Sequence, residues 1–238
     1  MSIWLLDGSK EAINMIITVG GTKGGGGKTT IATNLAVMRT RAGSDVLLID
    51  ADPQGTASTF TVLRNTDAKD TPKYTCVRLL GEEIINSFES LKSKYQDIVI
   101  DAGGRETDSH RAALGIADVA LIPFQPSSFD IWELGKAAKV VKEMRTMNKN
   151  LKAYTLINLA DPRGTDNEAA AEYAGEVEGL LFIPQPIVNR KAFKRAAASG
   201  LSVIEVKPQD QKATEEMQAL YEFAFGIAGA TIQMAANQ

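Results

Sequence analysis

The chain has 238 residues and a net charge of −3, with 44% hydrophobic and 23% charged residues. These values are ordinary for a globular protein, exclude a disordered or low-complexity chain, and suit one α/β domain rather than two. Because the chain has a single cysteine, a disulfide framework and a zinc or iron–sulfur cluster built from several of its own cysteines are also excluded.

Strands and helices are predicted to alternate along the chain, and uninterrupted apolar runs mark the strands. Residues 1–14 are predicted to form an N-terminal extension, in which residues 3–6 are a candidate edge strand. Residues 15–20 form the first strong strand, which leads into a glycine-rich loop and a helix at 29–41. Further strands are predicted at residues 45–50, 96–101, 118–123, 153–159 and 179–183, and further helices near residues 82–94, 128–147, 166–178, 190–199 and 210–227. This pattern indicates one doubly wound α/β domain over residues 15–238, with a mostly parallel sheet flanked by helices.

The strongest motif is the glycine-rich loop between the first strand and the first helix. It reads Thr-Lys-Gly-Gly-Gly-Gly-Lys-Thr-Thr over residues 22–30. Glycines let several backbone N–H groups point at one phosphate group, and the N-terminus of the following helix adds its dipole. In such a P-loop, Lys28 reaches the β- and γ-phosphates and the Thr29 hydroxyl binds Mg²⁺, although Thr22 occupies the place of the first glycine. The predicted ATP-binding residues of the loop are Lys23, Gly24, Gly25, Gly26, Gly27, Lys28, Thr29 and Thr30.

Acidic residues end two of the apolar strands beside this loop. Asp50 and Asp101 are the last residues of their predicted strands, and Asp52 follows two residues after the first of them. Ligands of open parallel sheets bind at the carboxyl ends of the strands, and a carboxylate buried there needs a cation, which Mg²⁺ supplies. Asp50 could share this role or merely cap the end of its strand.

Four segments together resemble the ParA/MinD superfamily of ATPases over residues 15–225. The loop matches the deviant Walker A pattern K-G-G-x-G-K-[ST], in which Lys23 is the extra lysine. Residues 50–55 match the D-x-D-P-Q-G motif, and residues 97–104 are similar to the Walker B strand and the loop that follows it. Residues 187–203 are similar to the late basic segment of small ParA partition proteins.

The resemblance implies a role for each charged residue of these motifs. Lys28 and Lys23 act on the phosphates, and Lys23 does so across a dimer interface, from the opposing protomer. Asp52 orients the attacking water and belongs, with Thr29 and Asp101, to the residues around Mg²⁺. Hydrolysis is then in-line attack of water on the γ-phosphate.

Two further segments are expected at the same sheet edge. Gly103-Gly104 replaces the Pro-Pro pair that is common after the Walker B aspartate, and its mobile N–H groups could contact the γ-phosphate as a switch. Asn158 follows a strand, and its amide could bond a purine edge, although a turn at residues 161–164 is an equally good explanation of this segment.

Two clusters of basic residues are candidates for DNA contact. Arg190, Lys191, Lys194 and Arg195 have the spacing of one helix face, which suits sequence-independent phosphate contacts. A second face is predicted on a helix at residues 136–152, where six lysines and arginines oppose Glu143. A solvated surface helix is the alternative for each cluster, and no element is typical of a base-specific reader.

The resemblance therefore implies a nucleotide switch that partitions a plasmid or chromosome region. ATP joins two protomers, the dimer binds double-stranded DNA non-specifically, and a ParB-like DNA-binding or adaptor protein stimulates hydrolysis. The alternatives are a MinD-like membrane regulator, an ATPase that positions a protein cargo, and a metabolic enzyme on the same scaffold. The tail 225–238 has no Lys or Arg, which disfavours the membrane regulator.

The remaining observations concern location and the only histidine. No apolar run approaches the roughly 20 residues of a membrane span, and the first residues lack the pattern of a signal peptide, so we expect a cytoplasmic, nucleoid-associated protein. His110 lies in a polar stretch predicted to be a loop, where a surface or packing role is favoured over Ser-His-Asp catalysis.

Overall fold

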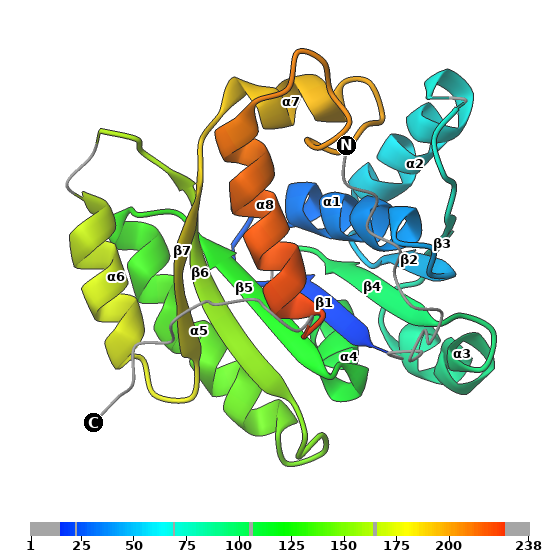
Figure 1. Cartoon of the computed structure of the whole chain (residues 1–238). Helices are drawn as coiled ribbons and strands as arrows, with labels where there is room; N and C mark the ends of the chain where they lie inside the picture. Colours follow the sequence, from blue (N-terminus) through cyan, green and yellow to red (C-terminus); the bar gives the residue numbers. More distant parts are fainter. Residues whose placement is uncertain (1–14, 22, 69, 105–106, 164–165, 227–238) are drawn as a thin grey trace.

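Seven parallel strands form one sheet in the computed structural model, which describes residues 15–21, 23–68, 70–104, 107–163 and 166–226 (Figure 1). The strands are β1 (Ile16–Gly20), β2 (Val46–Asp50), β3 (Thr75–Arg78), β4 (Asp97–Ala102), β5 (Val119–Phe124), β6 (Lys152–Ala160) and β7 (Leu181–Val188). Their order across the sheet is β3-β2-β4-β1-β5-β6-β7, and every neighbouring pair is parallel. The predicted α/β fold is confirmed.

Helices cover both faces of the sheet (Figure 1). They are α1 (Lys28–Arg41), α2 (Thr56–Asp67), α3 (Glu82–Lys92), α4 (Asp108–Ile116), α5 (Ser128–Met144), α6 (Asp166–Glu176), α7 (Lys191–Ala197) and α8 (Gln211–Ala224). One hydrophobic core joins the sheet to α1, α2, α7 and α8, and the other joins it to α3, α4, α5 and α6. Successive strand residues alternate between the cores, as Ile16 and Ile17 do, which explains why the central strands are apolar at nearly every position.

Three elements of the structure are not predicted by the sequence. Helix α2 contains four threonines, which are poor helix formers, and strand β3 is a four-residue edge strand without a fully buried residue. Helix α4 lies where the sequence predicts a loop. Strand β7 also continues beyond the predicted stretch, because Pro184 and Pro186 are tolerated in a strand at the edge of the sheet.

The predicted basic helix at residues 136–152 is wrong. Helix α5 ends at Met144, Lys149 lies in a turn, and Lys152 begins β6. Arg145 is turned inward, where its guanidinium donates to the carbonyl oxygens of Leu151 and Gly179 at 3.1 and 2.7 Å. The cations of this stretch therefore do not share one helix face.

His110 is a buried core residue of α4. It is 1% exposed, and a Cβ atom placed on Gly20 would lie 2.6 Å from its Nε2, so the glycine of β1 makes room for the ring. Burial lowers the pKa of His110 to about 4, which keeps the ring neutral at pH 7. The predicted polar loop is wrong, and the structure gives this histidine a packing role.

The candidate edge strand at residues 3–6, the tail 227–238 and Thr22 lie outside the described residues. Among the residues that are described, no helix is both long and apolar enough to cross a lipid bilayer.

Candidate nucleotide-binding site

The glycine-rich loop connects the end of β1 to the start of α1. Gly25 and Gly27 have φ angles of +82° and +77°, a left-handed conformation that glycine adopts without steric cost. Gly27 is the N-cap of α1, so the first N–H groups of this helix are directed into the loop. The loop borders a cavity of about 660 Å³ at the carboxyl ends of the strands. Its lining residues are Gly24, Gly25, Gly27, Lys28, Thr29, Thr30, Asp52, Pro53, Gln54, Thr56, Gly103, Gly104 and Thr107.

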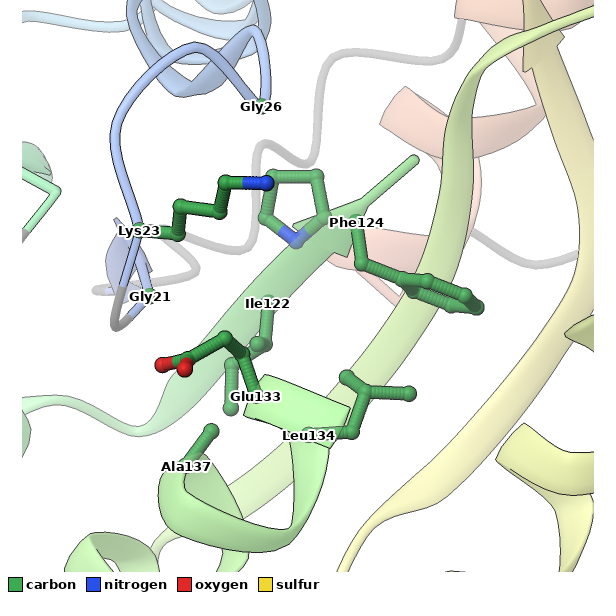
Figure 2. A pocket seen from close by; sticks show the side chains of 9 residues that line it. Gly21, Lys23, Gly26, Ile122, Phe124, Glu133, Leu134 and Ala137 are labelled. Atoms are coloured by element: carbon green, nitrogen blue, oxygen red, sulfur yellow. The ribbon is translucent and has the colours of Figure 1, made fainter. Parts of the chain in front are cut away.

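Two positive groups belong to the loop and differ in burial. Lys28 is 6% exposed, and its Nζ donates to the carbonyl oxygen of Lys23 at 2.7 Å, which holds the ammonium group at the loop. Lys23 itself is exposed. Figure 2 shows its side chain extending from the loop over a small pocket whose other wall includes Ile122 and Glu133. The lysine predicted to act on its own nucleotide is therefore enclosed, and the extra lysine is accessible.

Thr29 and Asp101 lie together beside the loop. The Thr29 hydroxyl donates to Asp101 Oδ2 at 2.7 Å, and Asp101 Oδ1 is buried without a hydrogen-bond partner among the described residues. Burial raises the pKa of Asp101 to about 7, because a carboxylate is costly to remove from water. A divalent cation would offset that cost, and hydroxyl and carboxylate oxygens are ligands that Mg²⁺ prefers.

A metal ion at this point would also need ligands from outside the protein. The part of the chain that the structure describes has no group of three or more His, Cys, Asp or Glu side chains able to hold a metal ion. Mg²⁺ commonly uses one or two carboxylates together with water and substrate phosphates. The pair formed by Thr29 and Asp101 fits that pattern.

Asp52 lies on the wall of the cavity that faces the loop. It is partly buried, and its Oδ1 accepts from the N–H of Gln54 at 2.9 Å. Asp50 is fully buried beneath it and accepts from two backbone N–H groups. The D-x-D-P-Q-G motif thus brings one carboxylate to the cavity and keeps the other below its surface.

The two glycines after β4 lie against both of the other loops. A Cβ atom on Gly104 would lie 2.6 Å from backbone atoms of Lys23 and Gly24, and one on Gly103 would lie 3.3 Å from Asp52 Oδ2. Gly103 also has a positive φ of +28°. These contacts bring the predicted switch loop to the cavity, whereas its contact with a γ-phosphate stays a prediction.

Asn158 supports the phosphate loop through a buried hydrogen bond. Its side chain is almost fully buried, and Nδ2 donates to the carbonyl oxygen of Gly26 at 2.7 Å. A Cβ atom on Gly27 would lie 2.2 Å from the same nitrogen, so this glycine is needed for close packing as well as for its φ angle. The sequence did not predict this role, because the two residues of the hydrogen bond are 132 positions apart.

A second cavity, of about 270 Å³, opens beside the loop on the side of α7. Its lining residues are Gly25, Gly27, Thr30, Ile31, Asn158, Leu159, Ile187, Asn189, Arg190, Phe193, Lys194 and Ala197. Asn158 is among these residues, which is compatible with a contact to a base in this cavity. That contact stays a prediction. Leu159 and Phe193 were missed at the sequence level; Leu159 has a φ of +57°, which no local pattern signals in a leucine.

The cluster at residues 190–195 is only partly available for DNA. Arg190 precedes α7 and is turned toward α8, where its guanidinium pairs with Glu216 at 2.6 Å. Arg195 is exposed but donates to the carbonyl oxygen of Pro208 at 2.7 Å, whereas Lys191 and Lys194 are exposed on α7. The single face predicted for all four residues is therefore wrong for Arg190.

The fold and the loop define the class of protein. A glycine-rich loop between a buried parallel strand and a helix, with threonine and aspartate oxygens beside it, is the site of a P-loop nucleotide-binding protein. The chain belongs to the CobQ/CobB/MinD/ParA nucleotide binding domain family, whose sequence profile matches residues 17–203.

Sequence similarity to known proteins supports this assignment over most of the chain. The chain is 30% identical over 214 residues to maintenance of carboxysome distribution protein A of Gloeobacter kilaueensis, which covers 87% of this chain and 92% of the relative. The protein of the same name from Halothiobacillus neapolitanus is 27% identical over 208 residues, with 86% and 93% covered. Protein ParA of Rhizobium radiobacter is 20% identical over 214 residues, with 89% and 95% covered.

Solved structures share the fold. Apo McdA of Cyanothece matches with a TM-score of 0.73 at 19% identity, over 88% of this chain and 98% of that chain. The cell division ATPase MinD of Pyrococcus furiosus matches with a TM-score of 0.67 at 19% identity, over 88% and 97%. At these identities the likeness describes the fold alone.

Proposed function

We propose that this chain is a Mg²⁺-dependent ATPase that positions a protein assembly inside the cell. The observation that carries the ATPase is the arrangement of Lys28, Thr29 and Asp101 around the glycine-rich loop. The protein cargo is supported by the two relatives named for carboxysome distribution, because each match extends over more than nine tenths of the relative. A carboxysome or a similar protein body is the cargo that this similarity favours.

The residues of the site divide the work of hydrolysis. Lys28 and the N–H groups of the loop hold the β- and γ-phosphates, and the base lies in the second cavity. Thr29 and Asp101 would hold Mg²⁺, which would neutralise charge on the phosphates. Asp52 accepts a hydrogen bond from the attacking water and orients it toward the γ-phosphate. Most of the catalytic effect comes from positioning and charge stabilisation.

The exposed Lys23 extends this proposal to a dimer. Two triphosphates that face each other repel, and a cation from each protomer would offset this repulsion in an interface with little water. The ATP-bound dimer binds DNA non-specifically through Lys191, Lys194 and Arg195, which associates it with the nucleoid. A cargo adaptor with the role of a ParB-like protein then stimulates hydrolysis and release.

Hydrolysis is tested with the purified full chain. The wild type should hydrolyse ATP when Mg²⁺ is present and stop when it is chelated. Asp52→Ala should lose at least about 100-fold in kcat while it still binds ATP, because the water loses its orienting carboxylate. Lys28→Ala should weaken ATP binding instead. Wild-type turnover by D52A would overturn the role of Asp52.

The nature of the cargo is tested by deletion of the gene in the source cell. Loss of even spacing of a protein body, with plasmids and chromosomes inherited normally, would support a protein cargo. Partition of a plasmid or chromosome region is the second candidate, and the full-length similarity to Protein ParA favours it. Frequent plasmid loss in cells whose protein bodies stay correctly spaced would establish that candidate instead.

A further inference from the structure

We infer that Asp50 is a positioning residue, which shapes the Asp52 loop through two backbone hydrogen bonds and does not bind the metal ion. The inference rests on the proposed hydrolysis of ATP and assigns a role to the first aspartate of the D-x-D-P-Q-G motif. Asp50 ends β2 and is 0% exposed. Asp50 is not among the residues that line the cavity, whereas Asp52 is.

Both oxygens of the Asp50 carboxylate accept from the segment that follows. Oδ2 accepts from the N–H of Ser58 at 2.7 Å, and Oδ1 accepts from the N–H of Asp52 at 3.3 Å. Ser58 lies in the first turn of α2, whose N-cap, Gly55, has no side chain to offer. The Asp50 carboxylate, which is not part of α2, therefore caps the N-terminus of this helix. Its negative charge also lies at the positive end of the helix dipole.

The two hydrogen bonds enclose the part of the chain that lines the cavity. Between the two donors lie Pro53 and Gln54, which border the cavity together with Asp52. The outer side of this loop is held by Arg78, whose Nη2 donates to the carbonyl oxygen of Pro53 at 2.9 Å. The loop is thus supported from below by Asp50 and from outside by Arg78, which determines where the Asp52 carboxylate lies.

A comparison with Asp101 distinguishes positioning from metal binding. The two residues are paired in register on adjacent strands, so their carboxylates start from equivalent places in the sheet. Asp101 has a buried oxygen without a partner and a bond to Thr29, whereas each oxygen of Asp50 accepts a backbone N–H. Only Asp101 presents an unused oxygen where a cation would bind.

The test is Asp50→Asn, because an amide keeps the size of the side chain but replaces one acceptor oxygen by a donor. One backbone N–H then loses its partner and the loop shifts. A displacement of about 1 Å at a catalytic group can cost roughly 100-fold in rate, so we expect kcat for ATP to fall about 10- to 100-fold. The KM for ATP and the concentration of Mg²⁺ that half-saturates the rate should change less than about 3-fold, because Lys28, Thr29 and Asp101 are untouched.

The matched control is Asp97→Asn. Asp97 is also a buried aspartate that accepts a backbone N–H. It is the first residue of β4, however, and therefore lies at the amino ends of the strands, whereas the cavity lies at their carboxyl ends. D97N should lower the melting temperature and leave kcat unchanged. If D50N behaves like D97N, Asp50 has only a structural role. If D50N instead raises the requirement for Mg²⁺ more than about 10-fold, Asp50 is a metal ligand; either result overturns the inference.

Amide hydrogen exchange tests the same geometry without turnover. In the wild type without nucleotide, the Ser58 amide should exchange at least about 10-fold more slowly than that of the exposed Thr56, and D50N should remove this difference. The wild-type measurement decides the question even if D50N does not fold: equal exchange at Ser58 and Thr56 would overturn the inference. A wild type that hydrolyses no ATP but protects Ser58 would refute the proposed function while supporting the contact made by Asp50.

Discussion

The contact between the switch loop and the phosphate loop leads to a prediction about Gly104. A methyl group at this position would lie 2.6 Å from the Cα and N atoms of Gly24 and from the carbonyl oxygen of Lys23. Ordinary contacts of a Cβ atom are 3.4–4 Å long. All three of these atoms belong to the backbone, so no side chain can rotate away and the two loops must separate by roughly 1 Å.

The expected cost of Gly104→Ala follows from this separation. Overpacking of a closely packed contact destabilises a protein by about 1–3 kcal/mol, which for a chain of this size lowers the melting temperature by about 2–12 °C. Because the displaced loop also touches Asp52 through Gly103, we expect kcat for ATP hydrolysis to fall about 10- to 100-fold.

Thermal unfolding without nucleotide and steady-state hydrolysis measure the two effects. Gly135→Ala is the matched control, because a Cβ atom on this glycine of α5 would meet nothing within 4 Å. It should raise stability by about 0.5–1 kcal/mol and leave the rate unchanged. A G104A protein with the wild-type melting temperature and rate would show that the two loops do not touch in solution.

Three more predictions concern charged residues. Lys23→Ala should still bind ATP as a monomer but should no longer dimerise in the presence of a slowly hydrolysed ATP analogue, which light scattering would measure. A K23A protein that dimerises normally would refute the proposal that Lys23 acts on the nucleotide of the opposing protomer. Burial raises the pKa of Asp101 in the folded state to about 7, above its ordinary value of 3.8, so the stability of the wild type falls as the pH rises between these two values. Asp101→Asn should therefore be more stable than the wild type at pH 8, by at most about 4 kcal/mol. Denaturant unfolding at pH 8 and pH 5 should show that the difference in stability between the two proteins is smaller at pH 5. A difference that does not change with pH would contradict the raised pKa of Asp101. Replacement of Lys191 and Lys194 by Ala should weaken binding of random duplex DNA by the ATP-bound dimer. The slope of log K against log salt should become less steep by about 1 for each lysine lost, which is up to about 4 for the two protomers, whereas an unchanged slope would remove both lysines from the DNA surface.

Local patterns were sufficient for the centre of the fold and for the phosphate loop. The strands β1, β2, β4 and β5 are apolar at most positions, and such runs identify buried parallel strands without knowledge of their neighbours. The run Gly-Gly-Gly-Gly-Lys-Thr after the first of them predicts a phosphate-binding loop, because many adjacent N–H groups beside a lysine suit a phosphate. The side chains of Thr29 and Asp101 could then be assigned to one site by sheet topology.

The sequence by itself determined the class of fold and identified the glycine-rich loop as the predicted site of the nucleotide phosphates. Tertiary structure alone decided that Asn158 supports Gly26, that Arg190 pairs with Glu216 and that the lysines after α5 leave its helical face. The physical reason is distance along the chain. A loop or a buried strand is specified by neighbouring residues, whereas a hydrogen bond between residues 26 or 132 positions apart exists only after the sheet and its helices have packed.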